Sequence, residues 1–321
     1  MEVHYHMEVI DPTYDTGFKL LFGRENVSEE VLKELLNALL ADDPYFRDIV
    51  SLRYLNSEHP HERQDGRGVR YDILCETSAR HRFIVEMQKN RQAHFLERSI
   101  YYVSRAVAEQ GYRGKTEEDN YWDYSLIPVI GVFLCNFVAP ELPNKFVTYA
   151  RLAERETGEP VSDSIRCIYI QLPLFSKTTE ADCKTYLEEW IYNIKNMGPN
   201  QNVAFTSHRE VFRRLAEISS VASLNEAERR SYEADLKAAR DYHAEMNTAR
   251  ADAFADGRAE GRAEGRAEGR AEGRAEGIAQ GLQKGRAEEK YTIAKLLVSE
   301  GQSPELIARV TGLSIEDILT L

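Results

Sequence analysis

Two short runs rich in β-branched and apolar residues, residues 69–77 and 82–88, are joined by a polar connector centred near Ala79. This pattern predicts an antiparallel hairpin. Side chains alternate between the two faces of a strand, so a turn at this connector places Asp72 opposite Glu86 on one face. Directly opposed carboxylates repel one another, and a positive charge between them removes that repulsion. The hairpin therefore constrains both the local fold and the local chemistry.

Two interpretations of the opposed acids follow. In the first, Asp72 and Glu86 hold a hard divalent cation such as Mg²⁺, which prefers oxygen ligands. Gln88, two residues along on the same face, then orients a water or a phosphate oxygen. In the second, the two acids are unrelated and lie on a solvated sheet face, where like charges also occur. Geometry alone leaves both open.

The sequence resembles a known family at this hairpin and at further places along the chain. Asp72 followed by Glu86-Met87-Gln88 resembles the active-site hairpin of the PD-(D/E)XK nuclease superfamily, and it is most similar to the branch of recombination-promoting nucleases and transposases. Five further stretches, in the same order, are similar to that branch: Asp15-Thr-Gly-Phe18-Lys19-Leu-Leu-Phe22, Tyr54-Leu55-Asn56-Ser57-Glu58, Phe95-Leu-Glu-Arg98-Ser-Ile-Tyr101-Tyr102, Gln110-Gly111-Tyr112 and Gln171-Leu-Pro-Leu-Phe175.

Two positions depart from the superfamily pattern. Tyr71 replaces the proline that names the motif. Gln88 stands where the superfamily usually has lysine, and a glutamine at this position is similar to this branch. A neutral amide supplies no positive charge beside the nucleophile, so slow or conditional cleavage is the expected consequence.

The resemblance implies a metal-dependent endonuclease that hydrolyses DNA with Mg²⁺ or Mn²⁺. It implies catalytic roles for Asp72, Glu86 and Gln88, with Asp72 and Glu86 as metal ligands. An acid on the first helix often assists in this superfamily, and Asp15 is the candidate here, although Asp15 equally suits a helix N-cap. Two alternatives stay open: a DNA-binding or assembly protein that keeps the fold without cutting, and a nuclease acting on RNA.

The charge distribution favours a nucleic-acid substrate near the hairpin. The net charge is −12, which argues against a surface that binds DNA everywhere. Residues 61–115, however, hold 11 Lys and Arg against 7 Asp and Glu, whereas residues 1–60 hold 5 against 12. The positive excess lies where a polyphosphate would dock. The candidates for contact with the DNA backbone are Lys19, Arg98 and Arg105, of which Arg98 matches the family pattern.

The predicted elements give an α/β class with a restriction-endonuclease-like core. Their order is α-β-β-β-α-β with a mixed sheet, followed by a helical C-terminal tail. The elements are helices within 11–25, 28–41, 93–109 and 182–200, strands at 49–55, 127–133 and 164–172, and the hairpin.

The tail divides by composition. From 212 to about 250 the chain is almost free of Gly and Pro and predicts one or two long helices, and residues 303 and 314 each open a further short helix. The predicted domains are a nuclease-like domain at 1–200, a helical extension at 201–256, a repeat spacer at 257–288 and a small helical module at 289–321.

Residues 257–276 are five copies of Gly-Arg-Ala-Glu. A period of four drifts by about 40° per repeat around an α-helix of ~3.6 residues per turn, so no fixed face forms. Like charges recur at i, i+4, and each glycine costs up to about 1 kcal/mol relative to alanine. We therefore expect a flexible or partly helical spacer that self-association could order. The C-terminal helices are accordingly candidates for a homo-oligomer contact.

The remaining composition points to a soluble cytoplasmic protein. No apolar run approaches the ~18 residues of a membrane span, and the first residues lack the features of a signal peptide. The cysteines have no metal-binding spacing, and three of the four lie in apolar strand-like runs, so reduced thiols are expected.

Overall fold

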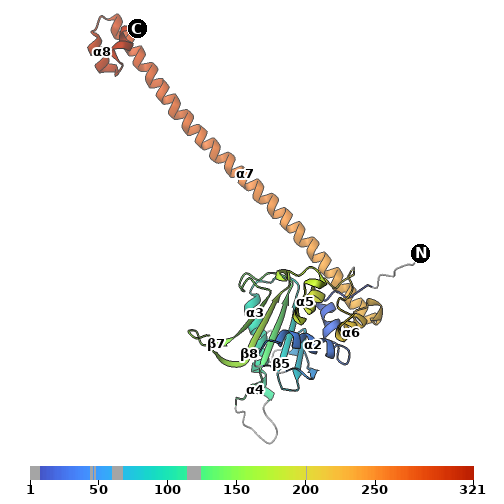
Figure 1. Ribbon diagram of the computed structural model, residues 1–321. Helices are drawn as coiled ribbons and strands as arrows, with labels where there is room; N and C mark the ends of the chain where they lie inside the picture. The colour runs from blue at the N-terminus through green and yellow to red at the C-terminus, as the bar shows by residue number, and fades with distance from the viewer. Residues whose placement is uncertain (1–7, 44–45, 47, 60–67, 114–123, 200) are drawn as a thin grey trace, which may run out of the picture. The chain divides into compact units, whose positions relative to one another are not determined.

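The computed structural model describes residues 8–43, 46, 48–59, 68–113, 124–199 and 201–321 (Figure 1). By internal packing the chain forms two compact units, Met1–Arg240 and Asp241–Leu321. The first unit holds the sheet and the hairpin. The second consists of helix alone.

The first unit is built on a six-stranded mixed sheet with strand order β1-β4-β5-β6-β8-β7. β5, β6 and β8 run parallel, and the other neighbouring pairs are antiparallel. The strands are β1 (Leu52–Tyr54), β4 (Ile73–Thr77), β5 (Arg82–Gln88), β6 (Val129–Cys135), β7 (Val147–Ala153) and β8 (Pro160–Gln171), and a separate pair is formed by β2 (Glu58–His59) and β3 (Val69–Arg70). The predicted α-β-β-β-α-β order and mixed sheet are confirmed. β7 is an additional strand that the sequence did not indicate.

Helices cover both faces of the sheet (Figure 1). α1 (Asp15–Phe22), α2 (Glu29–Leu40), α5 (Tyr186–Asn196) and α6 (Glu210–Ile218) share one core with alternate residues of the strands, whereas α3 (Phe95–Ala108) packs on the opposite face. On β5, Phe83, Val85 and Met87 face the first core, and Ile84 faces α3. Glu86 follows Ile84 on the α3 side. The short helices are α4 (Gln110–Arg113), η1 (Leu172–Leu174), η2 (Glu180–Asp182) and η3 (Val221–Ser223).

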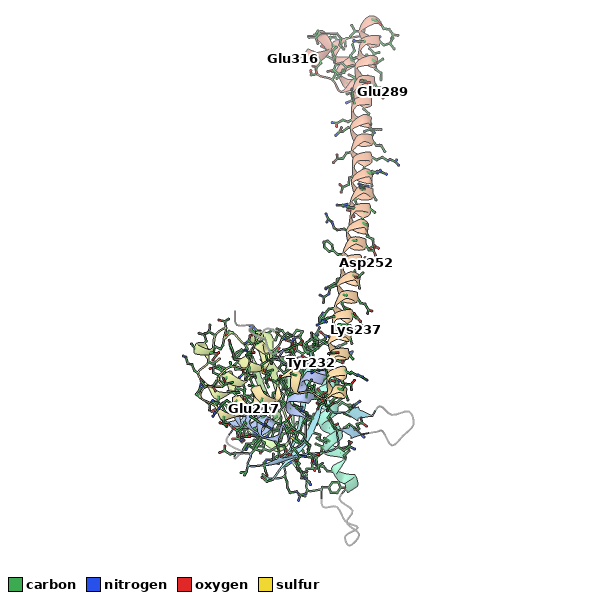
Figure 2. The ribbon with its side chains drawn as sticks, turned by 90° about the vertical axis from the view of Figure 1, so that its right-hand side faces the viewer. Glu217, Tyr232, Lys237, Asp252, Glu289 and Glu316 are labelled. Atoms are coloured by element: carbon green, nitrogen blue, oxygen red, sulfur yellow. The ribbon has the colours of Figure 1, made fainter. Side chains whose placement is uncertain are left out.

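The core of the first unit extends beyond residue 200. Phe212 of α6 is fully buried, as is Tyr232 near the start of α7 (Glu226–Ser299), which Figure 2 labels. The Tyr232 hydroxyl accepts a hydrogen bond from the backbone N–H of Asp11 (2.8 Å). Asp235 accepts another from the backbone N–H of Thr16 in the first turn of α1 (2.9 Å). The beginning of α7 therefore holds the N-terminus of α1 in place. The predicted four-part division of the chain stays a prediction.

The repeat is helical, which corrects the expectation of a flexible or partly helical spacer. Residues 257–285 belong to α7, and their side chains are exposed. Three residues of every Gly-Arg-Ala-Glu unit are strong helix formers, and no proline interrupts the segment. That propensity outweighs the glycines in this structure.

The two short C-terminal helices begin where the sequence predicts them. α8 (Pro304–Thr311) and α9 (Ile315–Leu319) pack with the end of α7 around Ala294, Ile307 and Ile318. Each short helix begins with a serine cap: Ser303 accepts from Leu306 N–H, and Ser314 accepts from Asp317 N–H.

All four cysteines are free thiols, and Cys75, Cys135 and Cys167 are buried. Across the residues that the structure describes, none of the helices combines the length and the apolar character needed to cross a bilayer.

Candidate active site

The hairpin forms with the predicted register. Ile73 pairs with Val85 and Glu76 with Arg82, so Asp72, directly before β4, lies across from Glu86. The turn is closed by Thr77, whose carbonyl accepts from Arg80 N–H (2.9 Å), and Arg80 takes up the left-handed region (φ 58°).

The first predicted run is not one strand, and this is a correction. Val69 and Arg70 pair with β2 as β3, and a new strand begins only at Ile73. Tyr71 and Asp72 connect β3 to β4 and belong to neither strand. The break frees the backbone of Asp72 to bond a side chain instead of the strand ladder.

The carboxylates of Asp72 and Glu86 are each fixed by a backbone N–H group of the hairpin. The N–H of Asp72 donates to Glu86 Oε1 (3.1 Å), and the N–H of Met87 donates to Asp72 Oδ2 (3.0 Å). Glu86 is only 2% exposed. The pair is therefore not two unrelated acids on a solvated face. Each carboxylate has one oxygen anchored on the backbone and one directed at other side chains.

Gln88 and Lys19 contact the remaining carboxylate oxygens. Gln88 Nε2 donates to Glu86 Oε2 (3.2 Å), which places Gln88 on the same side of β5 as Glu86. Lys19 Nζ lies 3.1 Å from Asp72 Oδ1. An amide and an ammonium group thus contact the two outward oxygens of the acid pair.

Asp15 lies in the first turn of α1, after the N-cap position, which Tyr14 occupies. It is therefore not the helix cap, which the sequence left open as an alternative. Its Oδ2 lies 2.8 Å from Lys19 Nζ, one helical turn away. Gly17 allows the close approach of α1 to the preceding turn, because a Cβ at this position would lie 2.1 Å from the carbonyl oxygen of Asp11.

Burial and mutual repulsion shift the acids toward their neutral forms. Burial, followed by the charge of Asp15, raises the pKa of Asp72 to about 7. Burial and then the charge of Asp72 raise the pKa of Glu86 well above its ordinary value. Burial also acts to raise the pKa of Asp15, but hydrogen bonds with Asp72 and Lys19 outweigh it, and that pKa is lowered. Asp72 and Glu86 are therefore carboxylates that an added cation would stabilise strongly.

The donor set suits a hard cation with few protein ligands. Mg²⁺ is commonly bound through one or two carboxylates together with waters and substrate phosphates. Asp72 Oδ1 and Glu86 Oε2 provide two such oxygens. Within the described ranges, no group of three or more His, Cys, Asp or Glu side chains forms a complete metal cage. The residues present fit an open Mg²⁺ or Mn²⁺ site and not a closed structural one.

Arg98 lies beside Gln88 at the site, whereas Arg105 pairs with an acid on its own helix. Arg98 on α3 shares a small pocket with Gln88, and its charge acts to lower the pKa of Glu86. Its guanidinium donates to the Tyr102 hydroxyl (3.0 and 3.2 Å). Arg105 pairs with Glu109 at 3.5 Å along the same helix.

Sequence reasoning missed three residues that hold the site. Tyr71 is fully buried, and its hydroxyl donates to the Tyr102 carbonyl (3.1 Å), which ties the hairpin to α3. An aromatic residue in a run of alternating character was the only available signal. Tyr232 and Asp235 hold α1 from a distance of more than 200 residues, and no local pattern marks them.

The six-stranded mixed sheet with helices on both faces is consistent with a restriction-endonuclease-like fold. A family model described as PD-(D/E)XK nuclease family transposase matches residues 12–249. The match spans well over half of the chain, so the protein belongs to this family. The resemblance seen in the sequence is confirmed, and it supports a nuclease- or transposase-like function. No match was found among curated proteins or among solved structures.

Proposed function

We propose that the protein is a metal-dependent endonuclease that hydrolyses phosphodiester bonds in DNA. The observation that carries this proposal is the pair of Asp72 and Glu86, which is largely buried. One oxygen of each carboxylate accepts a hydrogen bond from a backbone N–H group. In the reaction, the oxygen of a water forms a bond to phosphorus and the bond to the leaving sugar oxygen breaks. The water gives up a proton, and the leaving oxygen takes one up.

In this proposal Asp72 and Glu86 hold Mg²⁺ or Mn²⁺ through their outward oxygens. When bound, the cation would activate a water and stabilise the charge that develops on phosphorus. The backbone bonds of the pair keep those oxygens fixed, so little reorganisation is needed during the reaction. Gln88 positions the water or a phosphate oxygen. Asp15 is the third candidate ligand.

DNA contact is proposed at the α3 side of the hairpin. Arg98, beside Gln88, would hold the backbone near the acids, with Arg105 further along α3. Phosphate contacts of this kind position a duplex without reading its sequence. The non-cleaving alternative differs from this proposal only in the outcome of a cleavage assay.

Self-association is proposed for the C-terminal unit. Its small core leaves several large apolar side chains exposed, including Leu296, Val310 and Leu319. Exposed apolar surface of this kind is typical of a protein contact.

The proposed activity is tested with supercoiled DNA and the full chain. We expect nicking or cutting with Mg²⁺ or Mn²⁺, arrest of the reaction by a chelator, and no product with Glu86→Ala. Gel electrophoresis of the plasmid forms measures the result. Cleavage that persists in excess chelator, or at the parent rate in Glu86→Ala, would contradict the assignment.

Gln88 should affect turnover more than metal affinity. An amide that orients a water acts mainly in the transition state, so Gln88→Ala should lower the single-turnover rate by about 100-fold while Mn²⁺ affinity changes little. Gln302→Ala, an exposed glutamine in the C-terminal unit, is the matched control. If Gln88→Ala and Gln88→Lys both match the parent in rate and metal dependence, Gln88 has no part in the chemistry.

A further inference from the structure

Lys19 brings a positive charge to a site whose strand residue, Gln88, is neutral. Its ammonium lies between two carboxylates, 3.1 Å from Asp72 Oδ1 and 2.8 Å from Asp15 Oδ2. Its side chain is only 33% exposed, and it comes from α1, outside the hairpin. The ammonium therefore lies at the metal-binding edge of the acid pair.

The charges of the site require such a group. Asp15, Asp72 and Glu86 carry three negative charges when ionised, and a divalent cation neutralises two of them. The remaining negative charge would face the phosphate of an incoming substrate and repel it. The ammonium of Lys19 removes this remainder. Among the described side chains, Lys19 is the one that forms an ion pair with Asp72.

The position of Lys19 is built into the fold. Asp15 lies one helical turn before it and directs the ammonium toward Asp72. The first turn of α1 is fixed in turn by Asp235, which accepts from Thr16 N–H (2.9 Å). Gly17 lets the same turn lie against Asp11. A lysine held in this way loses less conformational freedom on meeting a substrate than a free surface lysine does.

Asp15 is less suited to hold a metal than the other two acids. Its side chain is 53% exposed, whereas that of Asp72 is 11% exposed. Its Oδ2 is engaged by Lys19. Asp72 and Glu86 are fixed by backbone N–H groups, whereas Asp15 is held by side chains, those of Lys19 and Asp72.

We propose that Lys19 is the active-site cation that contacts the reacting phosphate, and that Asp15 is its positioning residue and not a third metal ligand. This inference rests on the proposed nuclease function. It assigns the positive charge missing at position 88 to a residue of α1, which contacts Asp72 of the same pair.

The test combines metal binding with cleavage in the full chain. The variants are Lys19→Met, Asp15→Asn, the double variant Lys19→Met/Gln88→Lys, and Asp72→Asn as the reference for loss of a metal ligand. Lys33→Met serves as the matched control, because Lys33 lies on α2 and pairs with Glu34. Calorimetric titration with Mn²⁺ in the absence of DNA is the first readout. Single-turnover cleavage is the second, and melting temperature confirms folding.

Lys19→Met should bind Mn²⁺ as tightly as the parent or more tightly, because the ammonium no longer competes for Asp72 Oδ1. Its cleavage rate should fall by about 100-fold, the effect of losing one charge-stabilising group. Addition of Gln88→Lys to Lys19→Met should recover at least about tenfold of that loss, since the side chain at position 88 lies beside Glu86. Asp15→Asn should keep its Mn²⁺ affinity and lose less activity than Lys19→Met.

Three results would overturn the inference: parent-like cleavage by Lys19→Met, no recovery in the double variant, or loss of Mn²⁺ affinity in Asp15→Asn comparable to that in Asp72→Asn. Failure of the proposed function looks different, because the parent itself would then leave DNA intact. The contact with a reacting phosphate would fall with it. The Mn²⁺ titrations would still decide whether Asp15 holds a metal.

Discussion

Asp72→Asn and Glu86→Gln should each reduce metal-dependent cleavage by about 1000-fold while raising the melting temperature of the metal-free protein at pH 8. The loss of activity follows from removing a charged ligand oxygen from the pair. The gain in stability follows from burial, which raises the pKa of both carboxyl groups above their ordinary values, so that their ionisation at pH 8 favours the unfolded chain. Amides of the same shape can retain the bonds to the backbone N–H groups.

The raised pKa of Asp72 determines the direction in which Asp72→Asn changes stability at each pH. The pKa of Asp72 is about 7 in the folded protein and has an ordinary value of 3.8. Between these values the folded chain keeps a proton that the unfolded chain has lost, so stability falls as pH rises through this window. Asp72→Asn lacks this group. Its advantage in melting temperature should therefore be small near pH 4 and reach at least about 3 °C by pH 8.

Glu76 provides a matched control on the same hairpin. It pairs with Arg82 (3.0 Å) and Arg53 (3.1 Å). Burial acts to raise its pKa, but hydrogen bonds from the two arginines outweigh it, and the pKa is lowered. Glu76→Gln should therefore lower the melting temperature and leave cleavage unchanged. Parent-like cleavage by Asp72→Asn or Glu86→Gln, or a lower melting temperature at pH 8 in both, would refute this account of the acid pair.

The sequence was sufficient for the hairpin because two local rules determine it. The length of the connector sets the register, and alternation then sets which side chains share a face. Asp72, Glu86 and Gln88 could be grouped on these grounds alone. The break at Tyr71 could not be foreseen, because Val69 and Tyr71 continue the pattern of a strand while the hydrogen bonds pass to a different partner.

The contacts that complete the site depend on tertiary packing. Lys19 precedes Asp72 by more than 50 residues, and its sequence context indicates only a basic residue on a short helix. The strand β7 was missed because most of its residues are exposed, including the large apolar residues Tyr149 and Leu152, so no regular alternation of apolar and polar residues marks it. The repeat was misjudged because glycine cost and helix propensity nearly balance in Gly-Arg-Ala-Glu.

The end of the folded core was also hidden in the sequence. Beyond residue 200, the chain looks like an exposed polar helix, and its contribution to the core comes from a few well-spaced residues such as Phe212, Leu215 and Tyr232. These few residues carry the second large prediction.

A chain ending at residue 250 should stay folded and keep the acid pair, whereas a chain ending at residue 200 should not fold. The longer chain retains α6 and the start of α7, and the compact unit ends at Arg240. The shorter chain loses Phe212 and Leu215, which are fully buried, and truncation of such a residue typically costs about 2–5 kcal/mol. Loss of several exceeds the ~5–15 kcal/mol that holds a typical domain together.

The same deletion removes the anchors of the active-site helix, which separates its effect from a general loss of core. Tyr232→Phe and Asp235→Ala in the full chain remove only the hydrogen bonds to Asp11 and Thr16. They should leave the melting temperature within a few degrees of the parent and lower cleavage, because α1 presents Lys19 and Asp15 to the acids. Circular dichroism and thermal melting measure folding, and plasmid cleavage measures the site. A cooperative thermal transition in the chain ending at 200 would show that the segment from α6 to the start of α7 is not part of the folding unit. Absence of such a transition in the chain ending at 250 would show that the folding unit extends beyond residue 250.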